Sequence, residues 1–134
     1  MESIEKVLTV GPCDWSEPAA RLIAMAVQHA APLEIRNQVQ SGVASLFGVQ
    51  VGGELAAVFV LRVDRDSLGS EGVIVAAAGR VPGVDLTAVV LPHVEAMSRD
   101  CRAVRIHTAR PGMARKLVRA GYRPSEIVFA KDLK

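Results

Sequence analysis

The stretch Gly79-Arg80-Val81-Pro82-Gly83-Val84-Asp85-Leu86-Thr87-Ala88-Val89 joins a run of small and β-branched residues to an amphipathic helical pattern. A strand that feeds a glycine-containing turn and then a helix leaves several backbone N–H groups unpaired at the positive end of the helix dipole. Such a turn can hold a phosphate. Two residues oppose this, because Pro82 has no N–H and Asp85 places a carboxylate where the anion would sit. If Asp85 caps its own helix, we expect it to occupy the anion site.

The composition is typical of one α/β domain, which we expect to span residues 1–134. Half of the residues are apolar, 22% are charged and only 4% are aromatic, so we expect a core of Ala, Val, Leu and Ile. The N-terminus lacks the order of a signal peptide, and the longest apolar run, residues 55–61, is too short to span a bilayer. These features predict a cytoplasmic protein with no membrane partner. Cys13 and Cys101 have no metal-type spacing, so we expect free thiols and no metal site.

Positive charge is concentrated in residues 99–123, which hold eight basic residues and one acid, a net charge of +7, against −5 for the rest of the chain. This region could face a polyanion, or its basic side chains could simply solvate a helix and strand edges. No aromatic residues are interleaved as stacking platforms, which argues against single-stranded nucleic acid as a partner. Binding of nucleic acid through this region stays a minor alternative, which a salt-dependent mobility shift would reveal.

Hydrophobic periodicity predicts alternating strands and helices. We expect strands at residues 4–10, 46–51, 54–63, 71–78, 101–108 and 126–132, with Gly11 and Pro12 ending the first, Gly52 and Gly53 closing a hairpin, and a polar turn at residues 64–70. We expect helices from Asp14 or Ser16 to Ala30, from Leu86 to Met97, and from Pro111 or Gly112 to Gly121, with residues 33–44 a short helix or a loop. His29 and His93 are expected on helix surfaces. This order predicts an α/β (α+β) fold with a mixed, mostly antiparallel central sheet flanked by helices.

Three local patterns within residues 45–134 resemble the GNAT superfamily of acyl-coenzyme A dependent N-acetyltransferases. The hairpin over residues 47–63 is similar to a pair of strands in that family. The run Val75-Ala76-Ala77-Ala78-Gly79-Arg80-Val81-Pro82-Gly83-Val84-Asp85 resembles its fourth strand and pyrophosphate loop, whose pattern is Arg or Gln, two residues, Gly, one residue, then Gly or Ala. Here Arg80 and Gly83 match that pattern and Asp85 departs from it. The block ending in Ala120-Gly121-Tyr122 is similar to a family helix that closes on Gly-Phe.

The resemblance implies a cofactor, acetyl-CoA or another acyl-CoA, held in a gap between a fourth and a fifth strand that splay apart. Carried over by position, the backbone of Val75 and Ala77 would hold the pantetheine arm. The pyrophosphate would lie among residues 80–85, which include Arg80, Val81, Gly83, Val84 and Asp85. Arg110 stands where the family has an Asn near the start of the last helix, and Leu117 stands where it has the Tyr that serves as an acid.

Direct attack of an amine on a thioester needs a base for the proton of the amine. Glu71, at the head of the fourth strand, and His107, at the end of the fifth, are the candidates. The simpler interpretation is that Glu71 is a solvated carboxylate at a strand end and that His107 is a satisfied or exposed histidine.

The resemblance therefore implies an N-acetyltransferase acting on an amine of a small molecule or peptide. The alternative is an inactive member of the family that serves as an interaction or assembly protein, with a protein partner or as a homodimer. Pro82, Asp85 and Leu117 favour the alternative, whereas Arg80, Gly83 and the basic region favour the enzyme. With Asp85 as a helix cap, we expect acyl-CoA to bind weakly or not at all.

Overall fold

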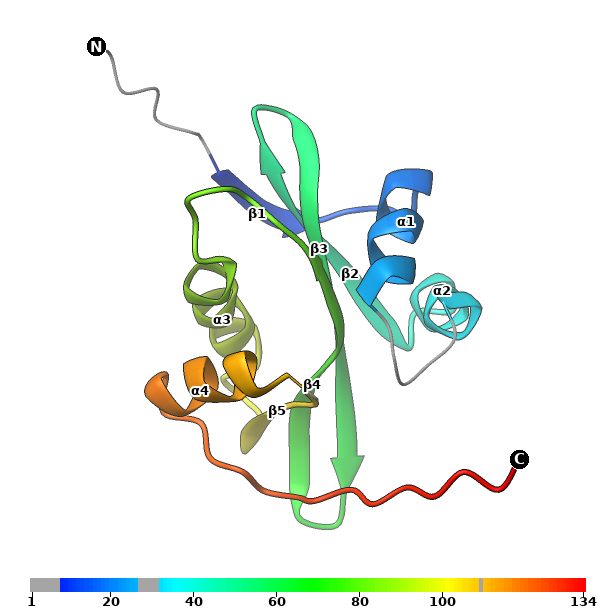
Figure 1. Cartoon of the computed structure of the whole chain (residues 1–134), viewed down its shortest axis with the longest axis vertical. Helices are drawn as coiled ribbons and strands as arrows, with labels where there is room; N and C mark the ends of the chain where they lie inside the picture. Colours follow the sequence, from blue (N-terminus) through cyan, green and yellow to red (C-terminus); the bar gives the residue numbers. More distant parts are fainter. Residues whose placement is uncertain (1–7, 27–31, 109) are drawn as a thin grey trace.

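The computed structural model describes residues 8–26, 32–108 and 110–134 and has one five-stranded sheet between two layers of helices (Figure 1). The elements, in chain order, are β1 (Leu8–Pro12), α1 (Glu17–Ala26), α2 (Pro32–Gln40), β2 (Ala44–Val51), β3 (Glu54–Asp66), β4 (Gly69–Gly79), α3 (Leu86–Met97), β5 (Ala103–Ile106) and α4 (Pro111–Arg119). The strands lie in the order β1-β2-β3-β4-β5, antiparallel except for the parallel pair β4–β5. The expected mixed, mostly antiparallel sheet with flanking helices is confirmed. No helix in the described ranges is long and apolar enough to cross a membrane.

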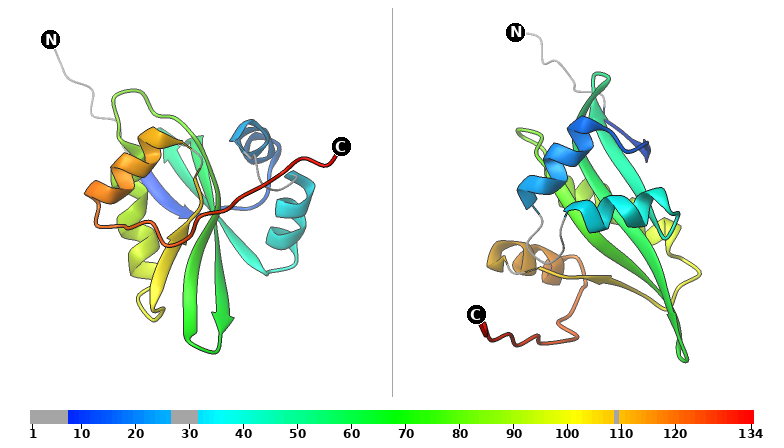
Figure 2. Two further views of the ribbon diagram at one scale, coloured as in Figure 1. Left: turned by 60° about the horizontal axis from the view of Figure 1, so that its bottom comes forward. Right: turned by 90° about the vertical axis from the view of Figure 1, so that its right-hand side faces the viewer.

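Each face of the sheet carries its own hydrophobic core, because α1 and α2 cover one face and α3 and α4 cover the other (Figures 1 and 2). On the first face, Ala19, Ile23 and Ile35 from the helices pack against side chains of β2 and β3. On the second face, Leu91, Val94 and Leu117 pack against the neighbouring side chains of β3 and β4. Alternate residues of β3 point to opposite faces, so this strand contributes to both cores.

Helix α1 begins as the sequence predicts, with Ser16 at its start. The Ala19 N–H donates to the Ser16 Oγ at 3.3 Å, and Ala19 and Ile23 are fully buried. The described part of the helix ends at Ala26. Residues 27–30 of the predicted helix, which include His29, lie outside the described residues.

Residues 33–44, which we expected to form a short helix or a loop, largely form the nine-residue helix α2 (Pro32–Gln40). Ile35 is its one fully buried residue, and Val39 is the one other side chain of the helix that packs against this core, partly buried. This explains why residues 33–44 show no apolar stripe.

The predicted hairpin between β2 and β3 is confirmed. Gly52 and Gly53 adopt φ values of +59° and +85°, the left-handed region that glycine occupies without steric cost. The stacked rings of Phe47 and Phe59, with centroids 5.1 Å apart, match the register in which these two residues face each other.

The next turn is shorter than expected, and the prediction of a turn over residues 64–70 is wrong. β3 continues to Asp66 and β4 begins at Gly69, so only two residues connect them. Backbone pairing between β3 and β4 continues through this polar stretch, since pairing requires no apolar side chains. The Leu68 N–H donates to Asp66 Oδ1 at 2.7 Å and tightens the turn.

The two edge strands also differ from the prediction. β1 includes Gly11 and Pro12, which pair with β2 instead of ending the strand, while residues 1–7 lie outside the described part of the chain. Pro12 is tolerated because the outer side of an edge strand has no ladder partner. β5 is confirmed as a strand, but it covers only Ala103–Ile106 of the predicted residues 101–108.

The structure has no strand over residues 126–132, and the prediction of one is wrong. The segment is extended but pairs with no described strand, and it runs away from α4 across the end of the sheet (Figures 1 and 2). A sequence pattern can specify strand propensity, but a strand also needs a partner edge in reach.

Arg62, Asp64 and Arg105 form an ion-pair network that ties β3 to β5, and through Gln38 to α2. Arg62 donates to both carboxylate oxygens of Asp64, at 2.6 and 3.1 Å, and to the Gln38 Oε1 at 3.0 Å. The Arg105 guanidinium lies 3.5 Å from Asp64. The hydrogen bond from Arg62 lowers the pKa of Asp64, desolvation opposes the shift, and the charges of Arg62 and Arg105 add to it.

We predict that Asp64→Asn destabilises the protein at neutral pH by about 0.5–1 kcal/mol, the range for a partly exposed ion pair. Because the pKa of Asp64 is lowered in the folded state, its contribution is present above the ordinary value of 3.8 and is lost as the pH falls through the folded-state pKa. Urea unfolding at neutral pH and well below 3.8 measures this difference. Asp100→Asn, in the exposed turn after α3, is the matched control. A loss that is equally large at both pH values would contradict the prediction.

Candidate ligand-binding cleft between β4 and β5

A cleft opens where β4 and β5 separate. The two strands pair only over Glu71–Ile74 and Ala103–Ile106, whereas β4 continues to Gly79. The resulting cavity has a volume of about 620 Å³. It is lined by the second half of β4, the neighbouring part of β3, the end of β5 and residues of α1, α3 and α4. The splay that the sequence resemblance implied is therefore present.

A β-bulge in β4 marks the point of separation. Val60 pairs with Ala76 and Leu61 pairs with Ile74, so Val75 has no residue opposite it. A bulge bends its strand and increases the local twist. Here it coincides with the last residue that pairs with β5, so the bend carries the rest of β4 away from β5.

The backbone of Ala77 faces the cleft. The Arg80 N–H donates to the carbonyl of Ala56 at 3.3 Å, so these two opposite residues form a hydrogen-bonded pair. Along an antiparallel ladder, hydrogen-bonded pairs alternate with pairs whose N–H and carbonyl groups point away from the partner strand. The pair Phe59–Ala77 falls in the other class, so the N–H and carbonyl of Ala77 point away from β3. Ala77 is also exposed, although it lies in the second strand from the edge of the sheet. An extended ligand could therefore pair with β4 here as a strand would.

The loop after β4 is a tight turn. The Val84 N–H donates to the Val81 carbonyl at 3.1 Å, with Pro82 and Gly83 between them. Gly83 has φ +76°, as the third residue of a type II turn requires, and Pro82 suits the second position. Val81 is 4% exposed and anchors the turn to the body of the protein. Gly83 and Val84 remain accessible at the start of α3, together with Arg80.

Asp85 caps α3, which is the arrangement under which we expected it to occupy the anion site. Its Oδ1 accepts from the N–H of Thr87 at 3.2 Å and from that of Ala88 at 3.5 Å, and the Lys116 Nζ lies 3.4 Å away. Desolvation is the largest single effect and raises the pKa of Asp85, but the N–H donors of Ala88 and Thr87 and the Lys116 ammonium together outweigh it and lower this pKa overall. A carboxylate that remains ionised therefore occupies the helix end where a phosphate would bind.

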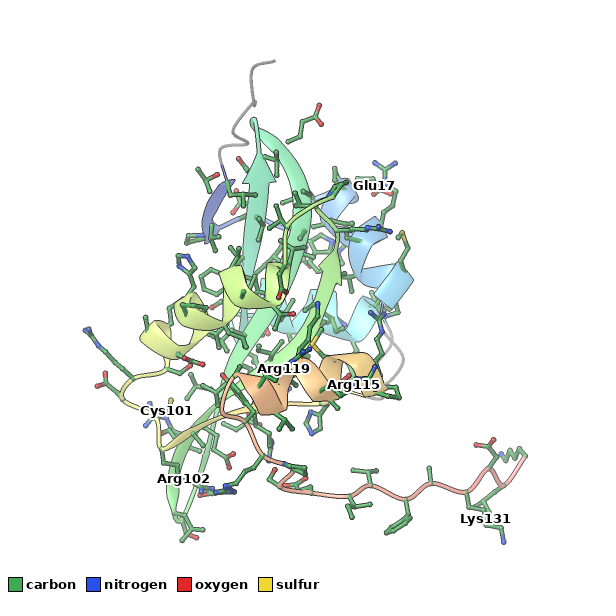
Figure 3. The ribbon with its side chains drawn as sticks, turned by 60° about the vertical axis from the view of Figure 1, so that its left-hand side comes forward. Glu17, Cys101, Arg102, Arg115, Arg119 and Lys131 are labelled. Atoms are coloured by element: carbon green, nitrogen blue, oxygen red, sulfur yellow. The ribbon has the colours of Figure 1, made fainter. Side chains whose placement is uncertain are left out.

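Helix α4 closes the cleft. Leu117, at the position where the resemblance would have Tyr, is buried and lines the cleft without a titratable group. Arg110 lies at the N-cap of α4, is exposed and also lines the cleft. Arg115 and Arg119 project from the same helix (Figure 3).

The two predicted base candidates lie in different places. His107 follows β5, is exposed and lines the cleft. Glu71 lies at the closed end, where β4 and β5 are still paired, and accepts a hydrogen bond from Arg102 Nη2 at 2.7 Å. The structure brings His107, Val75, Ala77, Arg80 and Arg110 to the cleft lining. It does not bring Glu71 there, and the predicted loop residues Val81, Gly83, Val84 and Asp85 also lie outside the lining.

Sequence reasoning missed several residues of the cleft. Thr87 and Thr108 place hydroxyl groups in its lining, and Leu22 and Met25 of α1 reach it from the other face of the sheet. The position of Thr87 two residues after Asp85 could have indicated it. Leu22 and Met25 gave no signal, because only the tertiary structure places α1 beside the gap.

Part of the positive charge in residues 99–123 is neutralised by carboxylates. Arg102 pairs with Asp66 and Glu71, Arg105 pairs with Asp64 and Glu126, and Lys116 pairs with Asp85. The basic region is therefore partly a structural network and partly, on α4, a free surface.

Comparison with solved structures gives the same fold. An acetyltransferase of Trypanosoma brucei is 14% identical, with a TM-score of 0.71 over 95% of this chain and 100% of the other. A predicted acetyltransferase of Clostridium acetobutylicum with acetyl-CoA is 9% identical, with a TM-score of 0.68 over 95% and 97%. An acetyltransferase of Bacillus subtilis in complex with CoA is 16% identical, with a TM-score of 0.65 over 89% and 77%.

No family model and no curated protein matches the sequence. The chain has the fold of the GNAT-type acetyltransferases, which confirms the resemblance at the level of fold. At these identities the likeness establishes the architecture, and the activity has to be argued from the cleft.

We predict that Gly79→Ala destabilises the protein by about 3 kcal/mol, because a positive φ and a steric overlap add together. Gly79 has φ +124°, and a Cβ there would overlap the carbonyl oxygen of Ala56 and the Cα of Ala57. Gly83→Ala is the matched control, since its φ is +76° but a Cβ would meet open space. We expect that variant to cost about 1 kcal/mol. Equal losses in denaturant unfolding would show that β3 and β4 are not in close contact at Gly79.

Proposed function

We propose that this chain is an N-acyltransferase that moves an acyl group from acetyl-CoA, or another acyl-CoA, to an amine of a small molecule or peptide. The observation that carries the proposal is the gap beside β4, where the free backbone of Ala77 faces a cavity of about 620 Å³. An extended amide-containing arm fits such a gap because it can hydrogen-bond to a strand edge as another strand would. The structures of two proteins with this fold contain CoA or acetyl-CoA.

The two ends of the cleft would serve different parts of the cofactor. Val75 and Ala77 would hold the arm. Arg80, which lines the cleft, and Gly83 and Val84, which follow it in the accessible loop, would lie beside the pyrophosphate. Arg110 would add positive charge at the start of α4. Val81 would fix the loop from below and Asp85 would oppose the anion.

Proton transfer would depend on His107. Acyl-CoA supplies an acyl group activated as a thioester, and the attacking amine must lose a proton. The imidazole of His107 lies at the cleft and can accept that proton, whereas Glu71 is held by Arg102 at the closed end of the strand pair. Leu117 offers no proton to the departing thiolate, so we expect slow turnover.

One observation favours the second candidate, an inactive protein that keeps the fold for interaction or assembly. Asp85 is engaged with two backbone N–H groups and Lys116, so the phosphate position is already filled by an internal anion. Measuring how acetyl-CoA binds to a variant without the Asp85 carboxylate distinguishes the transferase from the inactive protein.

We predict that the wild-type chain binds acetyl-CoA weakly and that Asp85→Ser binds it about tenfold more tightly. Serine keeps the helix cap but removes the carboxylate and releases Lys116. Calorimetric titration and thermal shift measure the change, since a ligand that binds only the folded state raises its apparent stability. Ala77→Pro is the matched loss-of-binding variant, because it removes an N–H that faces the cleft and leaves the β3–β4 ladder intact. Absence of binding to both the wild type and Asp85→Ser would rule out the transferase. Binding only by Asp85→Ser would support the inactive protein.

We further predict that His107→Gln lowers the rate of acetyl transfer by about 100-fold and leaves acetyl-CoA affinity unchanged. Release of free thiol from acetyl-CoA, measured with a panel of primary amines and peptides, reports the rate. Glu71→Gln is the comparison variant and should change the rate little, because its side chain is outside the cleft lining. If Glu71→Gln abolished turnover while His107→Gln did not, the assignment of the base would be reversed.

A further inference from the structure

Residues 126–134 expose a row of large apolar side chains. Ile127, Val128, Phe129 and Leu133 are 79%, 78%, 90% and 86% exposed. The segment is extended, and Figure 3 shows Lys131 far from the sheet. Contiguous exposed apolar residues mark surfaces that another molecule covers.

The sequence of this segment is typical of a strand. Ile127, Val128 and Phe129 have high β-propensity, and a strand would place Ile127 and Phe129 on one face with Val128 and Ala130 on the other. A strand that is apolar on both faces suits a position inside a sheet better than free solution.

The sheet has an unpaired edge at β5 that could accept this strand. β5 pairs with β4 on one side only, and no strand among the described residues pairs with its outer edge. An unpaired edge presents free N–H and carbonyl groups to another strand. Val104 and Ile106 of β5 belong to the rim of the core beneath α3 and α4 and are only half-buried. An added strand would cover them.

An ion pair brings the start of the segment beside β5. The Glu126 carboxylate lies 3.5 Å from the guanidinium of Arg105. Beyond Glu126 the segment leaves its own sheet (Figures 1 and 2). A free strand and a free edge therefore lie next to each other in one chain without being paired.

We propose that residues 126–132 add as a strand to the outer edge of β5 in a second copy of this chain. Residues 126–132 of the second copy pair in the same way with β5 of the first. A second copy is the fitting occupant because a two-fold axis pairs both free strands with both free edges at once. The edge of β1 is the poorer acceptor, since Pro12 lacks an N–H and Glu126 starts beside β5. This inference is independent of the proposed transferase activity.

The first test is the oligomeric state of the unmodified chain. Light scattering after gel filtration should show a dimer, and Phe129→Lys should weaken its association by about tenfold or more. The variant should fold normally, because Phe129 is 90% exposed. Leu33→Lys, at a 64% exposed apolar position of α2, is the matched control and should leave the dimer intact. A monomer at the concentrations used for NMR would overturn the proposal, as would a dimer unaffected by Phe129→Lys.

The second test distinguishes exchange between copies from closure within one copy. In an equal mixture of isotope-labelled and unlabelled chains, filtered NOE spectra should show contacts between Phe129 of one copy and the methyl groups of Val104 or Ile106 in the other. If the same contacts arise only within a single copy, the segment closes its own sheet and the exchange is wrong. Replacing two consecutive residues, Ile127→Pro with Val128→Pro, should abolish the contacts, because one of two consecutive N–H groups must face β5.

Discussion

The pairing of β4 with β5 ends at Ile74, and the candidate cleft of this protein depends on that break in the sheet. A strand inside a sheet normally satisfies its N–H and carbonyl groups on both sides. Here the bulge at Val75 bends β4 away from β5, so that Ala77 faces a cavity instead of a partner. The two helical layers then act as walls, with α1 on one side and α3 and α4 on the other (Figure 1).

The mouth of this cleft contains an electrostatic conflict. A helix N-terminus, an exposed arginine in the loop and a second arginine at the start of α4 favour an anion. Asp85 opposes one, because it already accepts from the N–H groups of the first turn and pairs with Lys116. The carboxylate of Asp85 and a bound phosphate would compete for the same N–H groups at the start of α3, so a phosphate would have to displace the carboxylate. The two proposed functions therefore differ in what they require of this one side chain, and they share the same fold.

The sheet presents unpaired backbone at two separate places. The gap beside the second half of β4 faces the cavity, whereas the outer edge of β5 faces solvent. Both present unpaired backbone, and both can be completed by an extended chain, a cofactor arm in one case and a strand in the other. The ion pair between Arg105 and Glu126 links the second edge to the segment that would complete it.

The sequence by itself determined the elements whose signals are local. Gly52 and Gly53 predicted the hairpin, Asp85 and one of Asp14 and Ser16 predicted helix starts, and the order of strands and helices predicted the architecture. It also indicated the loop from Arg80 to Asp85, whereas the placing of Ala77 at a gap was implied by the family resemblance. Only the tertiary structure decided that Glu71 lies at the closed end, that α1 reaches the cleft, and that residues 126–132 have no partner within the chain. The physical reason is that turns and caps depend on neighbouring residues, whereas strand pairing and cavities depend on which distant segments meet.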